Sequence, residues 1–426
     1  MNCVKIRPCE LKGNIKIPSS KSLGHRAIIC ASLSEEESII ENVNYSKDIK
    51  ATCSGMSKLG ALIIEVDNST LKIKKQKVAN KEKVFVDCSE SGSTVRFLIP
   101  ISLIEKKNAV FTGQGKLAYR PLDSYFNIFD EKEIKYSHPE GKVLPLEIDG
   151  KLSAGIFKLP GNISSQFISG LMFSLPFLDG DSVINITTDL ESVGYVDMTI
   201  DMLSRFGVKI ENNDYKSFYI KGNQKCKGTN YKVEGDFSQA AFWLTAGILN
   251  GDINCQNLNS DSLQGDKAIV DILKKMGGRL DERNFTAKKS QTHGIVIDAS
   301  QCPDLVPILS VIGALSLGTT KIINAARLRI KESDRLKAMA TELNKLGADV
   351  IELEDGLVIN GKDKLKGGEV ESWNDHRIAM ALAVAALKCE GSVTIRGSEC
   401  VAKSYPQFWS DFKKLGGDID EWSVGE

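Results

Sequence analysis

The sequence predicts an α/β protein of two domains, assembled from six repeated units. Three observations support this prediction. The chain has 426 residues, more than one hydrophobic core usually serves. Six times, at intervals of roughly 70 residues, an apolar strand-like end passes through a small polar loop into a helix-like run. Amphipathic helix-like segments also end repeatedly in an apolar residue followed by glycine, which is typical of a helix C-terminus.

Each recurring loop is predicted to join the end of a strand to the start of a helix. The strand ends lie at Ile17, Val86, Leu159, Val233, Ile297 and Val370. The glycines that end helices are Gly60, Gly207, Gly277, Gly347 and Gly416. The second unit has Phe129 and Asp130 at this point instead. Each unit therefore reads as strand, helix, strand and helix, with one or two further strands.

The two ends of the chain are predicted to share a domain. Residues 370–426 are too few for a complete sixth unit, whereas residues 1–16 form an additional pair of strands before the first. We therefore expect residues 1–16 to complete the last unit. Three units per domain then give one domain at residues 17–232 and a second at 233–426 completed by 1–16. The active site is expected in the cleft between them.

The composition excludes several classes of protein. Lys and Arg number 55, as do Asp and Glu, which argues against a nucleic-acid-binding surface. No apolar segment resembles a membrane span or a targeting signal, so we expect a cytoplasmic protein. The ten cysteines have irregular spacing and are expected to be reduced. The four histidines form no zinc-binding pattern.

Basic residues recur in the loops and at the predicted helix starts. Any one of them is most simply a solvated surface residue. Their recurrence beside Ser and Gly favours anion binding instead, because a helix N-terminus offers free N–H groups and a positive dipole end. These residues are Lys21, Arg26, Arg96 and Arg377 at helix starts, and Arg120, Lys331, Arg335 and Lys403 in other connections.

Three segments allow both a structural and a chemical interpretation. In residues 329–336, Ser333 or Asp334 could cap a helix, while Glu332 between two cations could move a proton. In residues 374–377, the first two could cap a helix and Arg377 could bind an anion. Residues 161–166 place two hydroxyls and an amide at a helix start, which suits a phosphate monoester.

Taken in order along the chain, these segments closely resemble the enolpyruvyl transferase family. The segments are 18–26 (PSSKSLGHR), 91–96 (SGSTVR), 120–122 (RPL), 161–166 (GNISSQ), 233–236 (VEGD), 303–304 (PD), 331–336 (KESDRL), 374–377 (NDHR) and 402–406 (AKSYP). The resemblance implies a two-domain inside-out α/β barrel of β-α-β-α-β-β units, three per domain. It also implies transfer of the enolpyruvyl group of phosphoenolpyruvate to the 5-hydroxyl of shikimate 3-phosphate, with release of phosphate, on the route to chorismate and the aromatic amino acids. A monomer with no metal or other cofactor is expected.

The resemblance also assigns residues to each substrate. Shikimate 3-phosphate is expected to contact Lys21, Ser22, Arg26, Ser164, Ser165, Gln166, Ser192, Tyr195, Asp304 and Lys331. Phosphoenolpyruvate is expected to contact Lys21, Gly92, Arg120, Gln166, Arg335, Arg377 and Lys403. Asp304 is expected to deprotonate the attacking hydroxyl, while Glu332 and Lys21 exchange a proton with the methylene carbon.

Some residues depart from the family pattern, and two alternative functions stay open. Glu90, Gly194 and Arg327 replace an Asn, a Pro and a substrate-contacting Asn, respectively. One alternative is the sister transferase that acts on UDP-N-acetylglucosamine, whose loop carries a cysteine that fosfomycin alkylates. Residues 112–120 contain no cysteine. The other alternative is a non-catalytic relative that binds RNA ends or phosphate ligands. Glyphosate is expected to compete with phosphoenolpyruvate near Gly92.

Overall fold

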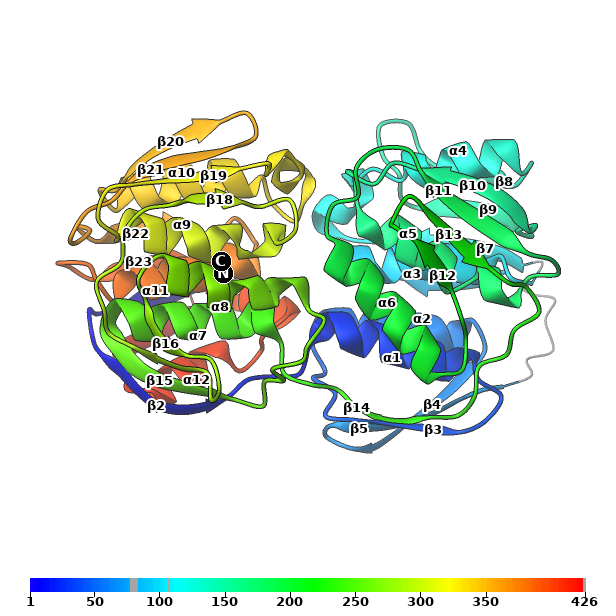
Figure 1. The fold of residues 1–426 in the computed structure, drawn as a ribbon, viewed down its shortest axis with the longest axis horizontal. Helices are drawn as coiled ribbons and strands as arrows, with labels where there is room; N and C mark the ends of the chain where they lie inside the picture. Colours follow the sequence, from blue (N-terminus) through cyan, green and yellow to red (C-terminus); the bar gives the residue numbers. More distant parts are fainter. Residues whose placement is uncertain (77–82, 106, 424–426) are drawn as a thin grey trace. The chain divides into compact units, whose positions relative to one another are not determined.

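The computed structural model describes residues 1–76, 83–105 and 107–423. Its contacts divide the chain into two units, each with its own hydrophobic core. We call Ser19–Glu234 the continuous unit. The split unit combines Met1–Pro18 with Gly235–Glu426. In Figure 1 the chain begins in blue in the split unit and continues from blue to green through the continuous unit. It then returns to the split unit, where it runs from green to red. Within the described residues, no helix is long and apolar enough to cross a membrane.

Each unit contains three sheets, and each sheet has four strands. Those of the continuous unit are, in spatial order, β14 (Asn230–Lys232), β3 (Ser38–Glu41), β5 (Thr70–Lys75) and β4 (Ala61–Asp67); β6 (Val84–Asp87), β7 (Lys107–Thr112), β9 (Leu146–Gly150) and β8 (Lys135–Ser137); and β10 (Gly155–Leu159), β11 (Ser182–Ile186), β13 (Ser217–Ile220) and β12 (Glu211–Asn213).

The sheets of the split unit repeat the same pattern. They are β16 (Arg279–Asp281), β17 (Thr286–Lys288), β15 (Gly251–Gln256) and β2 (Leu11–Lys16); β18 (Val296–Asp298), β19 (Thr319–Ile323), β21 (Gly356–Asn360) and β20 (Asp349–Leu353); and β22 (Gly368–Glu371), β23 (Val393–Arg396), β1 (Asn2–Ile6) and β24 (Ile419–Ser423). In every sheet one pair of neighbouring strands is parallel, and the remaining pairs are antiparallel. The predicted six-unit α/β fold is confirmed.

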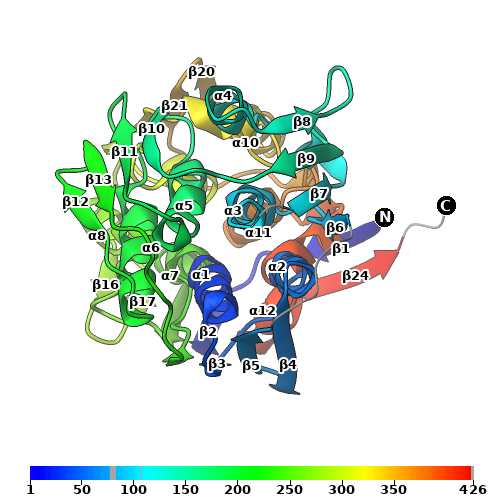
Figure 2. The ribbon, with the colours of Figure 1, turned by 90° about the vertical axis from the view of Figure 1, so that its right-hand side faces the viewer.

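Helices form the interior of each unit and the sheets surround them, as Figure 2 shows for the continuous unit. Its helices are α1 (Lys21–Leu33), α2 (Lys47–Lys58), α3 (Gly92–Ser102), α4 (Asp123–Glu131), α5 (Ser165–Met172) and α6 (Val193–Arg205), with 3-10 turns η1 (Gly115–Tyr119) and η2 (Leu175–Phe177). The split unit has α7 (Phe237–Asn250), α8 (Ala268–Lys275), α9 (Val306–Ala314), α10 (Arg335–Lys345), α11 (His376–Ala386) and α12 (Phe408–Lys414), with η3 (Gly265–Lys267), η4 (Pro303–Leu305), η5 (Ala326–Ile330) and η6 (Ser398–Lys403).

The first helix of each repeat is buried on all sides because it lies at the centre of its unit. Every residue of α9 and α11 is buried, and so is nearly all of α7. Beyond the polar first turns of α7 and α11 these helices are largely apolar, as expected for helices without a solvent face. The sheets instead have one face in solvent, where large apolar side chains such as Phe85 and Val296 are more than half exposed. The polar starts of the central helices are therefore the places where chemistry can be presented.

The glycines predicted to end helices all adopt left-handed backbone angles. Gly60, Gly207, Gly277, Gly347 and Gly416 have φ between 82° and 111°. A side chain disfavours this conformation, so glycine is required to end the helix and turn into the next strand. In the second unit, where the pattern lacked a glycine, Glu133 adopts φ 56° after α4.

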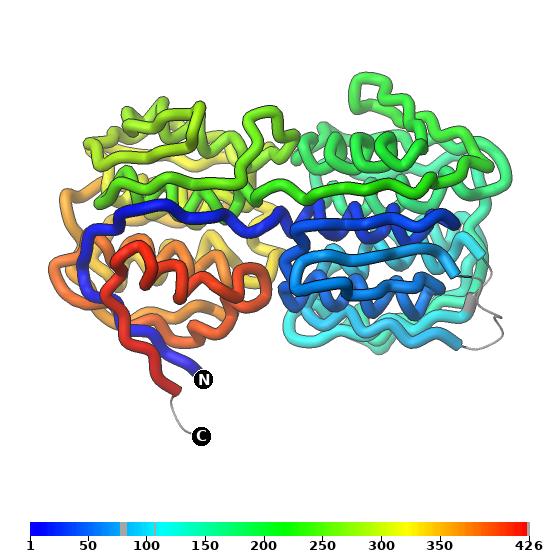
Figure 3. Tube along the Cα trace, turned by 90° about the horizontal axis from the view of Figure 1, so that it is seen from below, coloured from blue at the N-terminus to red at the C-terminus, as the bar shows by residue number. Residues whose placement is uncertain are grey.

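The prediction that residues 1–16 complete the sixth unit is half wrong. β1 does join the last sheet, where Asn2 pairs with Ser423, and the blue β1 lies beside the red β24 in Figure 3. β2 instead pairs in parallel with β15, with Leu11 opposite Gly251. The equivalent strand before α7, β14, pairs with β3 of the continuous unit. The chain thus exchanges two equivalent strands where it passes from one unit to the other, and both sheets keep four strands.

Candidate active site

The continuous unit gathers its predicted site residues at the starts of α1, α3, α5 and α6. Lys21 is the first residue of α1, which Ser20 caps. The Nζ of Lys21 lies 2.7 Å from Asp48 Oδ2 at the start of α2, and both side chains are less than one-fifth exposed. Asp48 was missed by sequence reasoning because nothing in its local pattern distinguishes it from an ordinary first-turn carboxylate. It holds the Lys21 ammonium at the helix start.

Arg26, one turn further along α1, is buried and connects α1 to α6. Its Nε donates to Thr199 Oγ1 at 2.8 Å, and its Nη2 donates to the carbonyl oxygen of Tyr195 at 2.9 Å. Nη1 donates to the carbonyl oxygen of Ser22 at 2.8 Å. Burial lowers the pKa of Arg26 to about 10. Most donors of this guanidinium thus serve the protein, so Arg26 chiefly fixes the places of Ser22 and Tyr195.

Ser192, the residue before α6, has a left-handed backbone with φ 56°. This conformation is uncommon for a residue other than glycine, asparagine or aspartate, and it concentrates at functional sites. Ser192 precedes Tyr195 by one helical turn at the same helix start. The structure therefore brings two predicted site residues together at α6. Gly194, where a Pro was expected, lies within the first turn of α6.

The starts of α3 and α5 are joined through Gln166. Its Oε1 accepts a hydrogen bond from Arg96 Nη1 at 2.7 Å, and its Nε2 donates to Ser93 Oγ at 2.9 Å. Ser164 caps α5, and its Oγ accepts from the backbone N–H of Gln166 at 3.3 Å. The polar sequence at 161–166 thus forms the predicted helix start, and Arg96 fixes the orientation of the Gln166 amide.

Gly92 begins α3 directly against the guanidinium of Arg120. A Cβ at Gly92 would lie 2.6 Å from Arg120 Nη1 and 2.9 Å from its Cζ. A side chain at this position would therefore require the guanidinium of Arg120 to shift. Arg120 is buried, only 7% exposed. The departure at Glu90 lies close by, with its carboxylate directed at Gly115, where a Cβ would come within 2.7 Å of Glu90 Oε2.

In the split unit, the buried guanidinium of Arg335 holds three carboxylates. Its Nε lies 2.8 Å from Asp375 Oδ2, its Nη1 lies 2.9 Å from Asp304 Oδ1, and its Nη2 lies 2.8 Å from Glu332 Oε2. The side chain is 1% exposed. Burial opposes the charge, yet the three carboxylates together raise the pKa of Arg335 above its ordinary value. We call these four residues the Arg335 cluster.

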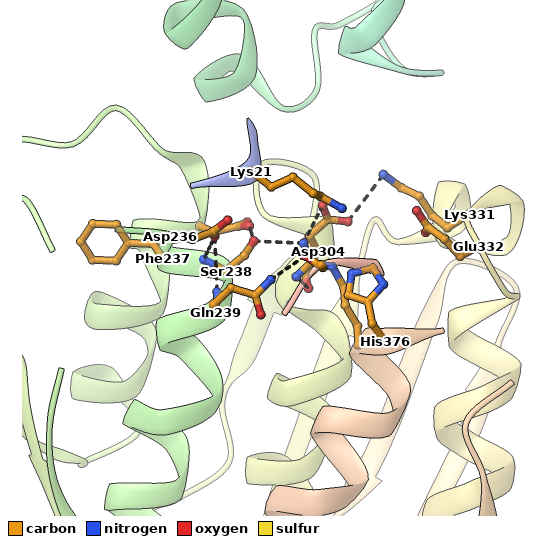
Figure 4. Close-up of polar contacts among 12 residues, drawn as sticks. Lys21, Asp236, Phe237, Ser238, Gln239, Asp304, Lys331, Glu332 and His376 are labelled. Atoms are coloured by element: carbon orange, nitrogen blue, oxygen red, sulfur yellow. Dashed lines mark hydrogen bonds and ion pairs between the residues drawn. The ribbon is translucent and has the colours of Figure 1, made fainter. Parts of the chain in front are cut away.

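Asp304 is the most strongly paired carboxylate of this cluster. Besides Arg335, it lies 3.6 Å from Lys331 Nζ and 3.3 Å from Arg377 Nη2. Figure 4 shows Lys331 extending toward Asp304. Burial lowers the pKa of Lys331 to about 8, although the charge of Asp304 works in the opposite direction. Lys331 can therefore exchange a proton close to neutral pH.

Asp375 and Asp334 resolve the two capping alternatives. Asp375 caps α11, accepting from the backbone N–H of Arg377 at 2.9 Å. Asp334 caps α10, accepting from the backbone N–H of Lys337 at 3.1 Å. Burial opposes ionisation of Asp375, but Arg335 holds its pKa below the ordinary value. These caps leave Glu332 and Arg377 on the site side of the loops.

Lys403, Arg377 and the start of α7 complete the split-unit cluster. Lys403 Nζ donates to the carbonyl oxygen of Asn374 at 2.7 Å and is buried. Arg377 Nη2 donates to Ser238 Oγ at 3.1 Å, and Ser238 donates in turn to buried Asp266. The departure Arg327 donates to the carbonyl oxygen of Ser300.

Ser238 and Asp266 were missed by sequence reasoning. Ser238 had a usable signal, because it lies in the fourth of the recurring polar loops. Asp266 had none, since it lies in η3, outside those loops.

The described residues contain no group of three or more His, Cys, Asp or Glu side chains that could hold a metal ion. All ten cysteines lie within the described residues and are free, and eight of them are buried. Burial raises the pKa of buried thiols such as Cys302, to about 12. The candidate site residues of the two units offer carboxylates, ammonium and guanidinium groups, hydroxyls and amides.

Comparisons with known proteins identify the fold and the family of this chain. A family model described as EPSP synthase (3-phosphoshikimate 1-carboxyvinyltransferase) matches residues 6–412. A 3-phosphoshikimate 1-carboxyvinyltransferase of Clostridium acetobutylicum is 82% identical over the full length of both chains, and one of Clostridium novyi is 61% identical, also over both full lengths. A solved EPSP synthase of Acinetobacter baumannii superimposes with a TM-score of 0.82 at 27% identity, covering 99% of this chain and 100% of its own.

The class that fold and site define is that of the enolpyruvyl transferases, confirming the resemblance seen in the sequence. Within this class, the chain belongs to the EPSP synthase family.

The first prediction concerns buried Asp266. Burial and the nearby charge of Asp304 raise the pKa of Asp266 to about 6. A carboxyl whose pKa is higher in the folded than in the unfolded state stabilises the fold while protonated, and this stabilisation is lost as the pH rises. The parent should therefore lose stability as the pH rises, whereas Asp266→Asn should not. The free energy of unfolding of the variant, relative to that of the parent, should increase by about 1 to 3 kcal/mol from about pH 4 to pH 7.

Urea denaturation across that pH range measures this difference. Asp271→Asn, an exposed carboxylate on α8, is the matched control and should show no such trend. A stability difference between Asp266→Asn and the parent that stays constant with pH would contradict the prediction.

Proposed function

We propose that this chain carries out the reaction of its family on two bound anions. The polar residues at the helix starts of the continuous unit act together with the Arg335 cluster, Arg377 and Lys403. Phosphoenolpyruvate donates its carboxyvinyl group to the 5-hydroxyl of shikimate 3-phosphate, and phosphate leaves. The full-length identity to 3-phosphoshikimate 1-carboxyvinyltransferases carries this assignment. It favours this substrate over UDP-N-acetylglucosamine and over a non-catalytic ligand-binding role. The enzyme acts as a monomer, and residues of both units serve its two substrates.

The continuous unit supplies most of the contacts to shikimate 3-phosphate. The hydroxyls and amide at the starts of α5 and α6 suit its phosphate and ring hydroxyls, since helix N-termini attract anions. Support comes from Arg26 and Arg96, whose bonds to Tyr195 and Gln166 fix these groups in advance. The residues assigned to this substrate are Lys21, Ser22, Arg26, Ser164, Ser165, Gln166, Ser192 and Tyr195, with Asp304 and Lys331 from the split unit.

Phosphoenolpyruvate is held by cations from both units. Its phosphate and carboxylate require several positive charges, and arginine offers a planar fork that matches either group. Support comes from the burial of Arg120, Arg335, Arg377 and Lys403, because charges near a low-dielectric interior attract an anion more strongly than exposed ones do. The residues assigned to this substrate are Lys21, Gly92, Arg120, Gln166, Arg335, Arg377 and Lys403.

The reaction proceeds by addition and then elimination. Asp304 takes the proton of the 5-hydroxyl as its oxygen attacks C2 of phosphoenolpyruvate, while Glu332 or Lys21 delivers a proton to C3. The other of these two groups then takes a proton from the new methyl group of the tetrahedral adduct, while the bond from C2 to the phosphate oxygen breaks and phosphate leaves. Support comes from Arg335, whose two terminal nitrogens bind Asp304 and Glu332 at 2.9 and 2.8 Å. Two carboxylates on one guanidinium are close enough to serve one substrate pair.

Phosphate release tests the proposed function directly. The purified protein is incubated with phosphoenolpyruvate, with and without shikimate 3-phosphate, and inorganic phosphate is measured. Release that depends on shikimate 3-phosphate is expected. Release that depends instead on UDP-N-acetylglucosamine, or no release with either acceptor, would overturn the assignment.

The second prediction concerns the two proposed proton carriers. Asp304→Asn and Glu332→Gln keep the shape of each side chain but abolish proton transfer, so each should lower kcat about a hundredfold or more. Glu352→Gln is the matched control, because Glu352 binds Arg329, outside the Arg335 cluster, and should leave kcat nearly unchanged. Near-normal turnover by either folded variant would remove that residue from the mechanism.

The third prediction concerns Gly92. A methyl group at this position would displace the guanidinium of Arg120, only 2.6 Å away. Gly92→Ala should therefore raise KM for phosphoenolpyruvate and weaken competitive inhibition by glyphosate even more, with KM for shikimate 3-phosphate nearly unchanged. Steady-state kinetics with each substrate varied in turn give these constants. Inhibition by glyphosate that is as strong in the variant as in the parent would contradict the proposed position of Arg120.

A further inference from the structure

The loop between β22 and α11 contains two successive residues in a strained conformation. Trp373 has φ 55° and Asn374 has φ 53°, both in the left-handed region. This conformation is unfavourable for a bulky residue such as Trp373, whereas asparagine adopts it more readily. Such a conformation persists only when the surrounding structure enforces it, and it concentrates where precise placement serves function.

A buried carboxylate on α10 restrains this loop. Glu342 is 1% exposed, and its Oε1 accepts a hydrogen bond from the indole Nε1 of Trp373 at 2.7 Å. Its Oε2 accepts from the backbone N–H of Glu371 at 3.0 Å. Lys345, from the same helix, supplies the balancing charge at 2.9 Å. The Glu342 carboxylate therefore restrains the loop through two hydrogen bonds, one at Glu371 at the end of β22 and one at Trp373.

The strained loop carries two elements of the candidate site. The carbonyl oxygen of Asn374 accepts from Lys403 Nζ at 2.7 Å. The next residue, Asp375, caps α11 and binds Arg335 Nε at 2.8 Å. Ser372 adds a third restraint, because its carbonyl oxygen accepts from the backbone N–H of Asp375 at 3.0 Å. The places of Lys403 and Arg335 thus both depend on the path of residues 372–375.

We propose that Glu342 is a positioning residue, which holds Trp373 and thereby sets the places of Lys403 and Arg335 for binding the anionic groups of phosphoenolpyruvate. This inference rests on the proposed assignment of those two cations. Neither Glu342 nor Trp373 is among the residues assigned to the two substrates. Burying a carboxylate in a helix is costly, and a backbone N–H at the end of a strand could be satisfied by a neutral acceptor. The hydrogen bond from the indole of Trp373 to this carboxylate instead restrains the loop that carries Asn374 and Asp375.

Two variants test the proposal. Glu342→Gln keeps the side-chain shape but directs an N–H₂ group at the N–H of Glu371 or the indole of Trp373, so one of the two hydrogen bonds is lost. Trp373→Phe keeps an aromatic ring at this position but removes the indole donor and part of the ring volume. Each should raise KM for phosphoenolpyruvate about tenfold, with KM for shikimate 3-phosphate unchanged within about twofold. Because both substitutions act on the same hydrogen bond, the double variant should raise KM for phosphoenolpyruvate little more than the single variant with the larger effect.

Lys345→Met is the matched control. It removes the charge that balances Glu342 but has no bond to the loop, so KM for phosphoenolpyruvate should stay near the parent value. A second readout does not depend on activity. Reaction of Lys403 with an amine-selective reagent, followed by peptide mass spectrometry, should be faster in Glu342→Gln and Trp373→Phe than in the parent or in Lys345→Met.

Several outcomes would overturn the proposal. One is a KM for phosphoenolpyruvate within twofold of the parent in folded Trp373→Phe, which decides the matter even if Glu342→Gln fails to fold. Another is an equal rise of both KM values, or a loss of thermal stability with unchanged KM, which would indicate a purely structural role. A parent protein that releases no phosphate would instead refute the proposed function, and the labelling of Lys403 would still test the geometry.

Discussion

The split-unit half of the candidate site depends on one buried guanidinium, that of Arg335, shared by Asp304, Glu332 and Asp375. These carboxylates come from three separate segments of the chain, before α9, before α10 and at the start of α11. Arginine suits this place because its rigid planar fork holds three acceptors at fixed angles, whereas the three donors of an ammonium group rotate. A buried ion cluster contributes little net stability, but removing one partner leaves an uncompensated charge. Its value here is to fix geometry.

The rest of the molecule serves to present such loops. Five of the six repeats place a buried, largely apolar helix behind a polar start that is capped by a short side chain, namely Ser20, Ser91, Ser164, Asp236 or Asp375, whereas the start of α9 has no side-chain cap. A helix that is apolar all round can be held only at the centre of a unit, which forces the sheets outward and leaves the capped ends as the polar surface. Anion binding therefore follows from the architecture, while the particular side chains at each end select the chemistry.

Much of this could be predicted from the sequence because the signals are local. Repeated loops and the glycines that end helices indicated six units, while cations beside Ser and Gly, together with the family resemblance, indicated the candidate site residues. The exchange of β2 and β14 could not be predicted, because the two strands are equivalent in local pattern and differ only in their partners. Asp48 and Asp266 were missed for a similar reason. A carboxylate far away in sequence becomes a site residue only when folding places it beside Lys21 or Arg377.

The coupling energy between Arg335 and Asp375 is the most direct test of the claim that this guanidinium organises the site. Urea unfolding of the parent, Arg335→Gln, Asp375→Asn and the double variant gives the four free energies of a double-mutant cycle. Because each single change leaves a buried charge without its main partner, we expect a coupling of at least about 2 kcal/mol. A coupling near zero, with all four proteins folded, would show that the two residues contribute independently and would contradict the account.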